Sequence, residues 1–289
     1  MYNEIEKEFI PASNDWIFKT LYTLNPELLA AVIRTVTKLD ISADKMTVRI
    51  VEEAPNEPQG KAIRLDIEVE TTEEKIDIEM QVCKELDFFQ RTLFYWAKMF
   101  TKDLHSGENY EELKPTICIN FLDCKLLETD AFFSHYILKE SERNEVEPTL
   151  AKQMNLYFIE LPKLDVTDLS NATELELWAK FLGAKSKEEL DMIEKANNPT
   201  INDAVRKLRD YNDDERAREL AFKRARAVTD YNHRYEKGIE KGRSDEKISN
   251  IISSYNAGVE VDLLAQIYKM SVDNINNIIN GSKEAKNND

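Results

Sequence analysis

Two stretches in which apolar and acidic side chains alternate constrain the fold of this chain more than any other feature. They are residues 63–70, IRLDIEVE, and residues 76–82, IDIEMQV, and a short polar break separates them. Side chains point alternately to the two faces of a strand, so each stretch is predicted to be a strand with one apolar and one polar face. A turn centred on Thr72 and Glu73 joins them into an antiparallel hairpin.

The polar face of this predicted hairpin gathers five carboxylates, which are Asp66, Glu68, Glu70, Asp77 and Glu79. The register set by the turn pairs Asp66 with Glu79 and Glu68 with Asp77. Directly opposed side chains lie about 5 Å apart, and like charges at that distance repel. One explanation is the solvent-exposed face of a sheet, although such a face normally mixes both charge signs. The other is a hard divalent cation, which one or two carboxylates hold together with waters and substrate phosphates.

The composition bounds the class of protein. A chain of 289 residues suffices for one large or two small domains with a buried core. Its net charge of -16 argues against a nonspecific polyanion binder. Cys83, Cys118 and Cys124 lack metal-ligand spacing and are odd in number, so we expect free thiols rather than a disulfide framework. The N-terminal segment is acidic without an apolar signal sequence, and no run approaches about 18 apolar residues. We therefore expect a soluble cytoplasmic protein with no membrane partner.

Basic side chains gather in one later segment of this acidic chain. They are Arg206, Lys207, Arg209, Arg216, Arg218, Lys223, Arg224 and Arg226. A segment of mixed charge is usually the solvated face of a helix. The alternative is a patch that contacts phosphates and compensates locally for the acidic body.

The order of the predicted elements is typical of a layered α/β fold. In chain order we expect a helical region at 14–36 that breaks at Asn25-Pro26, a strand at 45–53, the hairpin, a helix at 86–106, a buried strand at 115–122, strands at 131–139 and 155–161, and helices from 172 onward. This order predicts a mixed sheet flanked by helices.

A polar pair in the first predicted helix has two interpretations. Asp15 and Lys19 are four residues apart and share one helix face. As a surface ion pair they contribute little. Packed against the acidic hairpin, they bring a carboxylate and an ammonium group to a metal site. The sequence leaves both interpretations open.

The C-terminal segment is predicted to be a separate helical module. Residues 248–281 contain short helices separated by tight turns, as in a helix-turn-helix. Its last helix carries few basic residues, so packing or dimerisation, which would make a homodimer, is as well supported as DNA reading. We expect three parts: a main domain at 1–170, a helical extension with a charged linker helix at 171–247, and this module.

Several segments together resemble one nuclease family. They are NDWIFKTLY at 14–22, RLDIEVE at 64–70, IDIEMQV at 76–82, FFQRTLFYWAKMF at 88–100, ELKPTICINFLD at 112–123, SHYIL at 134–138 and LYFIELPK at 156–163. Over roughly residues 10–230 the chain resembles the PD-(D/E)XK nuclease family transposases, also called recombination-promoting nucleases. The resemblance implies a restriction-endonuclease-like core and metal-dependent hydrolysis of phosphodiester bonds in double-stranded DNA, in support of recombination.

The resemblance also assigns the metal site. Asp66 matches the acid of the first motif and Glu79 the acid of the second. Together with the backbone carbonyl of Met80, they would hold Mg²⁺, with Mn²⁺ as a substitute. Asp15 matches the acid that the first helix often adds to such sites. Gln81 stands where the broader family has a catalytic lysine.

Further roles follow from the same resemblance. Lys19 is the candidate to supply the positive charge that Gln81 lacks. Arg91 and Tyr95, on the helix after the hairpin, are candidate DNA contacts, with ordinary surface or core packing as their alternative. Arg224 and Arg226 are the other candidate DNA contacts, and they come from the charge pattern of the basic segment rather than from the resemblance. A catalytically silent DNA-binding relative and a plain protein-interaction module remain as rival functions, the first because Gln81 replaces lysine.

Overall fold

The computed structural model describes residues 9–53, 63–82, 87–105 and 107–286. The chain divides into two compact units, Met1–Ala225 and Arg226–Asp289, which are described separately. This division does not test the three predicted parts at 1–170, 171–247 and 248–281, which stay a prediction. Cys83 and residues 54–62 lie outside the described residues.

One mixed sheet forms the centre of the first unit. Its strands are β1 (Thr47–Glu53), β2 (Ile63–Glu70), β3 (Lys75–Gln81), β4 (Thr116–Leu122), β5 (Phe133–Ile137) and β6 (Met154–Glu160). Their spatial order is β1-β2-β3-β4-β6-β5. The pairs β3–β4 and β4–β6 are parallel, and the other neighbours are antiparallel. Every residue of β4 is buried, which explains its almost continuous apolar sequence.

The predicted hairpin and its register are confirmed. β2 pairs with β3 antiparallel, with Ile67 opposite Ile78 and Glu68 opposite Asp77. The turn is stabilised by Thr71, whose hydroxyl oxygen accepts from the backbone N–H of Glu74 at 2.8 Å. The alternation of apolar and polar residues therefore fixed the register, because a slip of one residue would have moved every apolar side chain to the other face.

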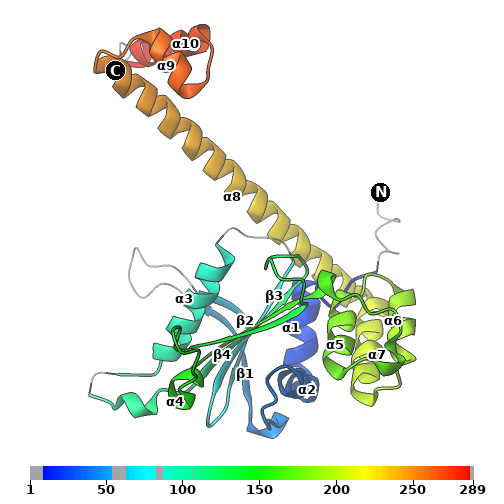
Figure 1. Cartoon of the computed structure of the whole chain (residues 1–289). Helices are drawn as coiled ribbons and strands as arrows, with labels where there is room; N and C mark the ends of the chain where they lie inside the picture. Colours follow the sequence, from blue (N-terminus) through cyan, green and yellow to red (C-terminus); the bar gives the residue numbers. More distant parts are fainter. Residues whose placement is uncertain (1–8, 54–62, 83–86, 106, 287–289) are drawn as a thin grey trace. The chain divides into compact units, whose positions relative to one another are not determined.

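Helices cover both faces of this sheet (Figure 1). On one face lie α1 (Asp15–Thr23) and α2 (Pro26–Thr37), which pack on the apolar side of β2 and β3. On the other lies α3 (Phe88–Thr101), which contacts β3 and β4. The predicted break between the first two helices is confirmed at Pro26, the first residue of α2. Asn14 caps α1, its side-chain oxygen accepting from two backbone N–H groups of the first turn.

The later part of the first unit is helical. After β6 it contains α5 (Glu174–Gly183), α6 (Lys187–Glu194), α7 (Pro199–Asp213) and the start of α8 (Glu215–Asn256), whereas the short α4 (Pro148–Ala151) lies between β5 and β6. In the second unit, α9 (Val261–Tyr268) and α10 (Val272–Lys286) pack around a small core of their own. Its most buried side chains include Ile251, Leu264 and Ile275. The predicted class, a mixed sheet flanked by helices with a helical C-terminal region, is confirmed. Within the described part of the chain, no helix is both long and apolar enough to cross a membrane.

Candidate functional site

The β2–β3 hairpin opens at the end away from its turn, and we call this opening, at Asp66 on β2 and Glu79 on β3, the fork. The ladder between the two strands ends at the pair Ile67–Ile78, although both strands continue beyond it against their other neighbours. Side chains occupy the opening. A carboxylate oxygen of Glu79 accepts from the backbone N–H of Asp66 at 3.0 Å, and a carboxylate oxygen of Asp66 accepts from that of Met80 at 3.0 Å. These two acids therefore share one point of the sheet, where the strands separate.

Helix α1 brings an ammonium group to this fork. Lys19 lies 2.8 Å from Asp66 and 2.6 Å from Asp15, as measured from its Nζ atom to their carboxylate oxygens. Only 7% of the lysine is exposed. Burial alone would lower the pKa of Lys19, but attraction to Asp66 and hydrogen bonds to both carboxylates raise it above its ordinary value. Lys19 is thus held as a cation beside the first predicted metal ligand.

Glu79 is the acid whose protonation is most affected by this environment. Burial first, and then the charge of Asp66, raise the pKa of Glu79 to about 8. Nearby cations act in the opposite direction, Arg91 more strongly than Lys19. A divalent cation at the fork would favour the charged form of Glu79, because an opposite charge within a few ångströms stabilises a carboxylate.

The three remaining acids of the hairpin do not reach the fork. Glu68 is buried and pairs with Lys102 at 3.4 Å and with Arg49 at 3.7 Å. Glu70 pairs with Lys114 at 3.0 Å. The cations that pair with Glu68 and Glu70 therefore come from other parts of the chain. The repulsion on these two acids is relieved without a metal, and the acids at the fork stay the candidate ligands.

Asp77 differs from its neighbours because it is buried and forms no ion pair among the described residues. It is 1% exposed, and its Oδ1 atom has no hydrogen-bond partner among the described residues. Burial and the neighbouring carboxylates hold the pKa of Asp77 well above its ordinary value. The same causes, burial and then Asp77 and Glu79, raise the pKa of the Cys118 thiol on β4. This part of the sheet therefore favours neutral groups.

Gln81 and Arg91 lie together at the end of β3. An Nη2 group of Arg91 on α3 donates to the side-chain oxygen of Gln81 at 2.7 Å. The guanidinium group also lies 5.2 Å from the centre of the Phe88 ring. Tyr95 packs against the cluster of Val51, Leu65 and Met99, which agrees with its packing alternative. Contact of Arg91 or Tyr95 with DNA stays a prediction.

Asp15 is engaged on both of its carboxylate oxygens. One accepts from Lys19, and the other accepts from Nε of Arg224 at 3.2 Å. Arg224 thus reaches the site from the start of α8. Direct metal ligation by Asp15 and DNA contact by Arg224 stay predictions. Arg226 is exposed on α8 and belongs to the second unit, so it is not placed relative to this site.

Two polar residues next to the site were missed by the sequence analysis. Asp123 follows β4, and its backbone N–H donates to the carbonyl of Gln81 at 2.8 Å. Its carboxylate pairs with Lys185, whose Nζ also donates to Ser13 at 3.3 Å. An acid directly after a buried parallel strand was the available signal for Asp123. Lys185 lies in the connection between α5 and α6 and carries no local signal.

The donor set at the fork fits a hard divalent cation. It offers carboxylate oxygens from Asp66 and Glu79, donors of the kind that Mg²⁺ and Mn²⁺ accept, and the backbone carbonyl of Met80 stays the predicted third donor. Glu79 is destabilised as an anion here, which a cation would reverse. Within the described ranges, no group of three or more histidine, cysteine or acidic side chains is arranged to hold a metal. A bound ion would therefore complete its coordination with water or substrate.

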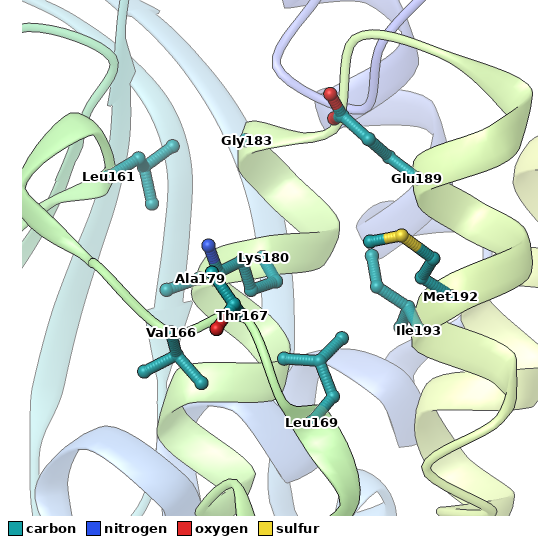
Figure 2. A pocket seen from close by; sticks show the side chains of 10 residues that line it. All are labelled: Leu161, Val166, Thr167, Leu169, Ala179, Lys180, Gly183, Glu189, Met192 and Ile193. Carbon is teal, nitrogen blue, oxygen red and sulfur yellow. The ribbon is translucent and has the colours of Figure 1, made fainter.

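A cavity elsewhere in the first unit is separate from these residues. It has a volume of about 360 Å³ and lies against α5 and α6, with apolar walls that include Leu161, Val166 and Met192 (Figure 2). Lys180 and Glu189 are the charged residues of its lining. Because none of the predicted site residues lines it, we assign the chemistry to the fork.

One comparison with known proteins gave a match. A family model described as PD-(D/E)XK nuclease family transposase matches residues 12–238, which include the sheet, α1, α3 and the start of α8. No curated protein and no solved structure matches the chain. The mixed six-stranded sheet flanked by helices fits the PD-(D/E)XK nuclease fold.

Proposed function

We propose that this chain, which belongs to the PD-(D/E)XK nuclease family transposases, is a divalent-metal-dependent endonuclease that hydrolyses phosphodiester bonds in double-stranded DNA. The observation that carries the proposal is the meeting of Asp66, Glu79 and Lys19 at the fork, with Lys19 Nζ 2.8 Å from Asp66. Two acids for a metal and one fixed cation for the phosphate are the groups that such a hydrolysis requires. A role in promoting recombination follows from the family alone.

Asp66, Glu79 and the Met80 carbonyl are the groups that would hold Mg²⁺, or Mn²⁺ in its place. When bound, the ion supplies positive charge to the scissile phosphate and lowers the pKa of the attacking water. Lys19 adds a second positive charge to the phosphate oxygens as negative charge develops on them. Its burial strengthens this effect, because fewer waters screen it.

The other residues at the fork orient and support these groups. Gln81 has a side-chain amide whose oxygen accepts from Arg91 at 2.7 Å, and we propose that this amide orients a water molecule by hydrogen bonds. Asp15 pairs with Lys19 and supports it, and direct ligation of the metal by Asp15 stays a prediction. Arg91, Tyr95, Arg224 and Arg226 stay the candidate contacts to the DNA. Residence in the cytoplasm is part of the proposal.

Gln81 favours a second candidate function. Glutamine provides no charge at the transition state, so a chain with Gln81 in the position of the lysine is also suited to binding DNA without cutting it. The two candidates differ in the role of Lys19. If it supplies the missing charge, the site is complete. If it only neutralises Asp66, the protein is a silent DNA-binding relative.

Cleavage of supercoiled plasmid tests the proposal. Wild type, Asp66→Ala and Glu79→Ala are compared with Mg²⁺, Mn²⁺, Ca²⁺ or EDTA. Glu70→Ala is the matched control, because it removes an acid from the same hairpin outside the fork. We expect cutting with Mg²⁺ or Mn²⁺ by wild type and the control, and loss of cutting in both fork variants. Cutting by Asp66→Ala at the wild-type rate would refute the site. Binding without cutting by wild type would support the silent relative.

A further inference from the structure

A chain of alternating charges connects the start of α8 to the fork. Arg224 donates to one oxygen of Asp15 at 3.2 Å, and Lys19 donates to the other at 2.6 Å. The same Lys19 Nζ lies 2.8 Å from Asp66. Arg224 and Asp15 are 209 positions apart in the sequence. The contact therefore brings a late segment of the first unit to the predicted catalytic lysine.

The start of α8 is anchored firmly enough to hold Arg224 in place. Ala217 is 6% exposed and Ala221 is fully buried, and both form part of the first unit's core. Phe222 packs against the same core. The backbone N–H of Ala217 also donates to the Asp214 side chain at 2.6 Å. Arg224 follows Ala221 by less than one helical turn, so its backbone is positioned by this packing.

Asp15 needs a second partner to stay where it is. It is the first residue of α1, and about a third of its side chain is exposed, so its carboxylate has access to solvent. With Lys19 as its one charged partner, it would retain the freedom to rotate. The Arg224 guanidinium group occupies the other oxygen and fixes the carboxylate against the lysine. Partners that orient a reactive group from behind commonly matter about 10- to 100-fold in metal affinity or activity.

We infer that Arg224 is a positioning residue that holds the Lys19 ammonium group beside Asp66 by way of Asp15. This inference rests on the proposed nuclease function. It differs from the sequence-based role of Arg224 as a DNA contact. A phosphate contact would weaken DNA binding and reduce its salt dependence when removed. A positioning residue instead changes the cleavage rate of DNA that is already bound.

The kinetic test compares Arg224→Ala, Arg224→Lys and Lys195→Ala under single-turnover conditions with saturating DNA. Lys195 is an exposed lysine at the end of α6 and controls for the loss of one positive charge. We expect Arg224→Ala to lower the cleavage rate constant roughly 10- to 100-fold with DNA affinity unchanged. Arg224→Lys should recover most of the rate, and Lys195→Ala should match wild type. Weaker DNA binding by Arg224→Ala at an unchanged rate constant would overturn the inference.

A double-mutant cycle shows whether Arg224 acts through Asp15. In an Asp15→Asn background, Arg224→Ala should cause no further loss of rate, because the carboxylate that it holds is gone. Losses that multiply across the two substitutions would instead show that the residues act independently. That result would overturn the inference.

A spectroscopic measurement tests the same inference without relying on activity. A buried ammonium group hydrogen-bonded to two carboxylates exchanges its protons slowly, so Lys19 should give a lysine side-chain signal in a ¹⁵N-correlated NMR spectrum. Lys19→Arg identifies that signal by its absence. We expect Arg224→Ala to shift or broaden it and Lys195→Ala to leave it unchanged. An unchanged signal in Arg224→Ala overturns the inference, whereas failure of wild type to cut DNA overturns the proposed function alone.

Discussion

Replacement of Lys19 by methionine is the sharpest test of how this site works. Methionine keeps the length and apolar stem of the side chain but removes its charge. In the structure Lys19 is 7% exposed and pairs with Asp66 at 2.8 Å and with Asp15 at 2.6 Å. We expect Lys19→Met to stop most DNA cleavage while the protein remains folded.

The structure sets the size of both effects. Breaking a buried ion pair typically costs about 3–5 kcal/mol. Here each carboxylate keeps another partner. Asp66 still accepts from the backbone N–H of Met80, and Asp15 still accepts from the guanidinium group of Arg224. Both carboxylates also have some exposure, so we expect a loss of about 2 kcal/mol in the free energy of unfolding. Folded proteins typically have a free energy of unfolding of about 5–15 kcal/mol, so a loss of this size leaves the protein folded. Loss of one group that stabilises transition-state charge typically costs about 10²- to 10³-fold in rate.

The assay combines urea denaturation with single-turnover cleavage of a plasmid. Lys114→Met is the matched control. Lys114 pairs at 3.0 Å with Glu70, an acid of the same hairpin that lies away from the fork. Adding Gln81→Lys to Lys19→Met should restore part of the rate by returning a charge to β3. That recovery should be incomplete, because Arg91 lies 2.7 Å from the Gln81 oxygen and repels a second cation. Cleavage by Lys19→Met within threefold of wild type would refute this account of the site.

Two further predictions concern stability. In the unfolded chain Glu79 has its ordinary pKa of 4.5, whereas in the folded protein its pKa is about 8. Between these values the folded state binds the proton and the unfolded state does not, so the metal-free protein should lose stability as the pH rises from 4.5 to about 8. We expect a slope of up to about 1.4 kcal/mol per pH unit in urea titrations, flattened by Glu79→Gln but not by Glu70→Gln; a stability that rises with pH in wild type would contradict this. The buried side chain of Asn212 accepts from the backbone N–H of Ile10 at 2.8 Å and donates to its carbonyl at 2.9 Å. Asn212→Ala should therefore lower the free energy of unfolding, measured by urea denaturation, by about 2–4 kcal/mol. Asn171→Ala, at an exposed asparagine, should change it little. An equal effect of the two substitutions would show that these buried bonds contribute little.

Local patterns in the sequence were sufficient for most of the fold. Alternation of apolar and polar residues predicted β2 and β3 together with their register, because side chains on a strand repeat every two residues. Pro26 marked the start of α2, because proline at the first helical position acts on the backbone of its own turn. The continuous apolar run at 115–122 predicted a strand buried on both faces.

The functional site could not be resolved by such patterns. Five acids share the polar phase of the hairpin, and alternation treats them alike. Packing separates them: cations such as Lys102 and Lys114 pair with Glu68 and Glu70, and Asp77 is buried with no ion pair among the described residues. Where the β2–β3 ladder ends, the carboxylate of Asp66 meets Lys19 of α1. The difference lies in what covers each residue, and that depends on segments distant in the sequence.

The sequence by itself determined which residues alternate, where helices start and which family the motifs resemble, because these depend on neighbours within a few positions. The tertiary structure decided that Lys19 faces Asp66 rather than solvent, and that Arg224 meets Asp15 across 209 positions of the chain. Both contacts depend on how α1 and α8 pack on one core. Distances between elements of that kind are set by the volume and shape of many buried side chains together, and no local pattern encodes them.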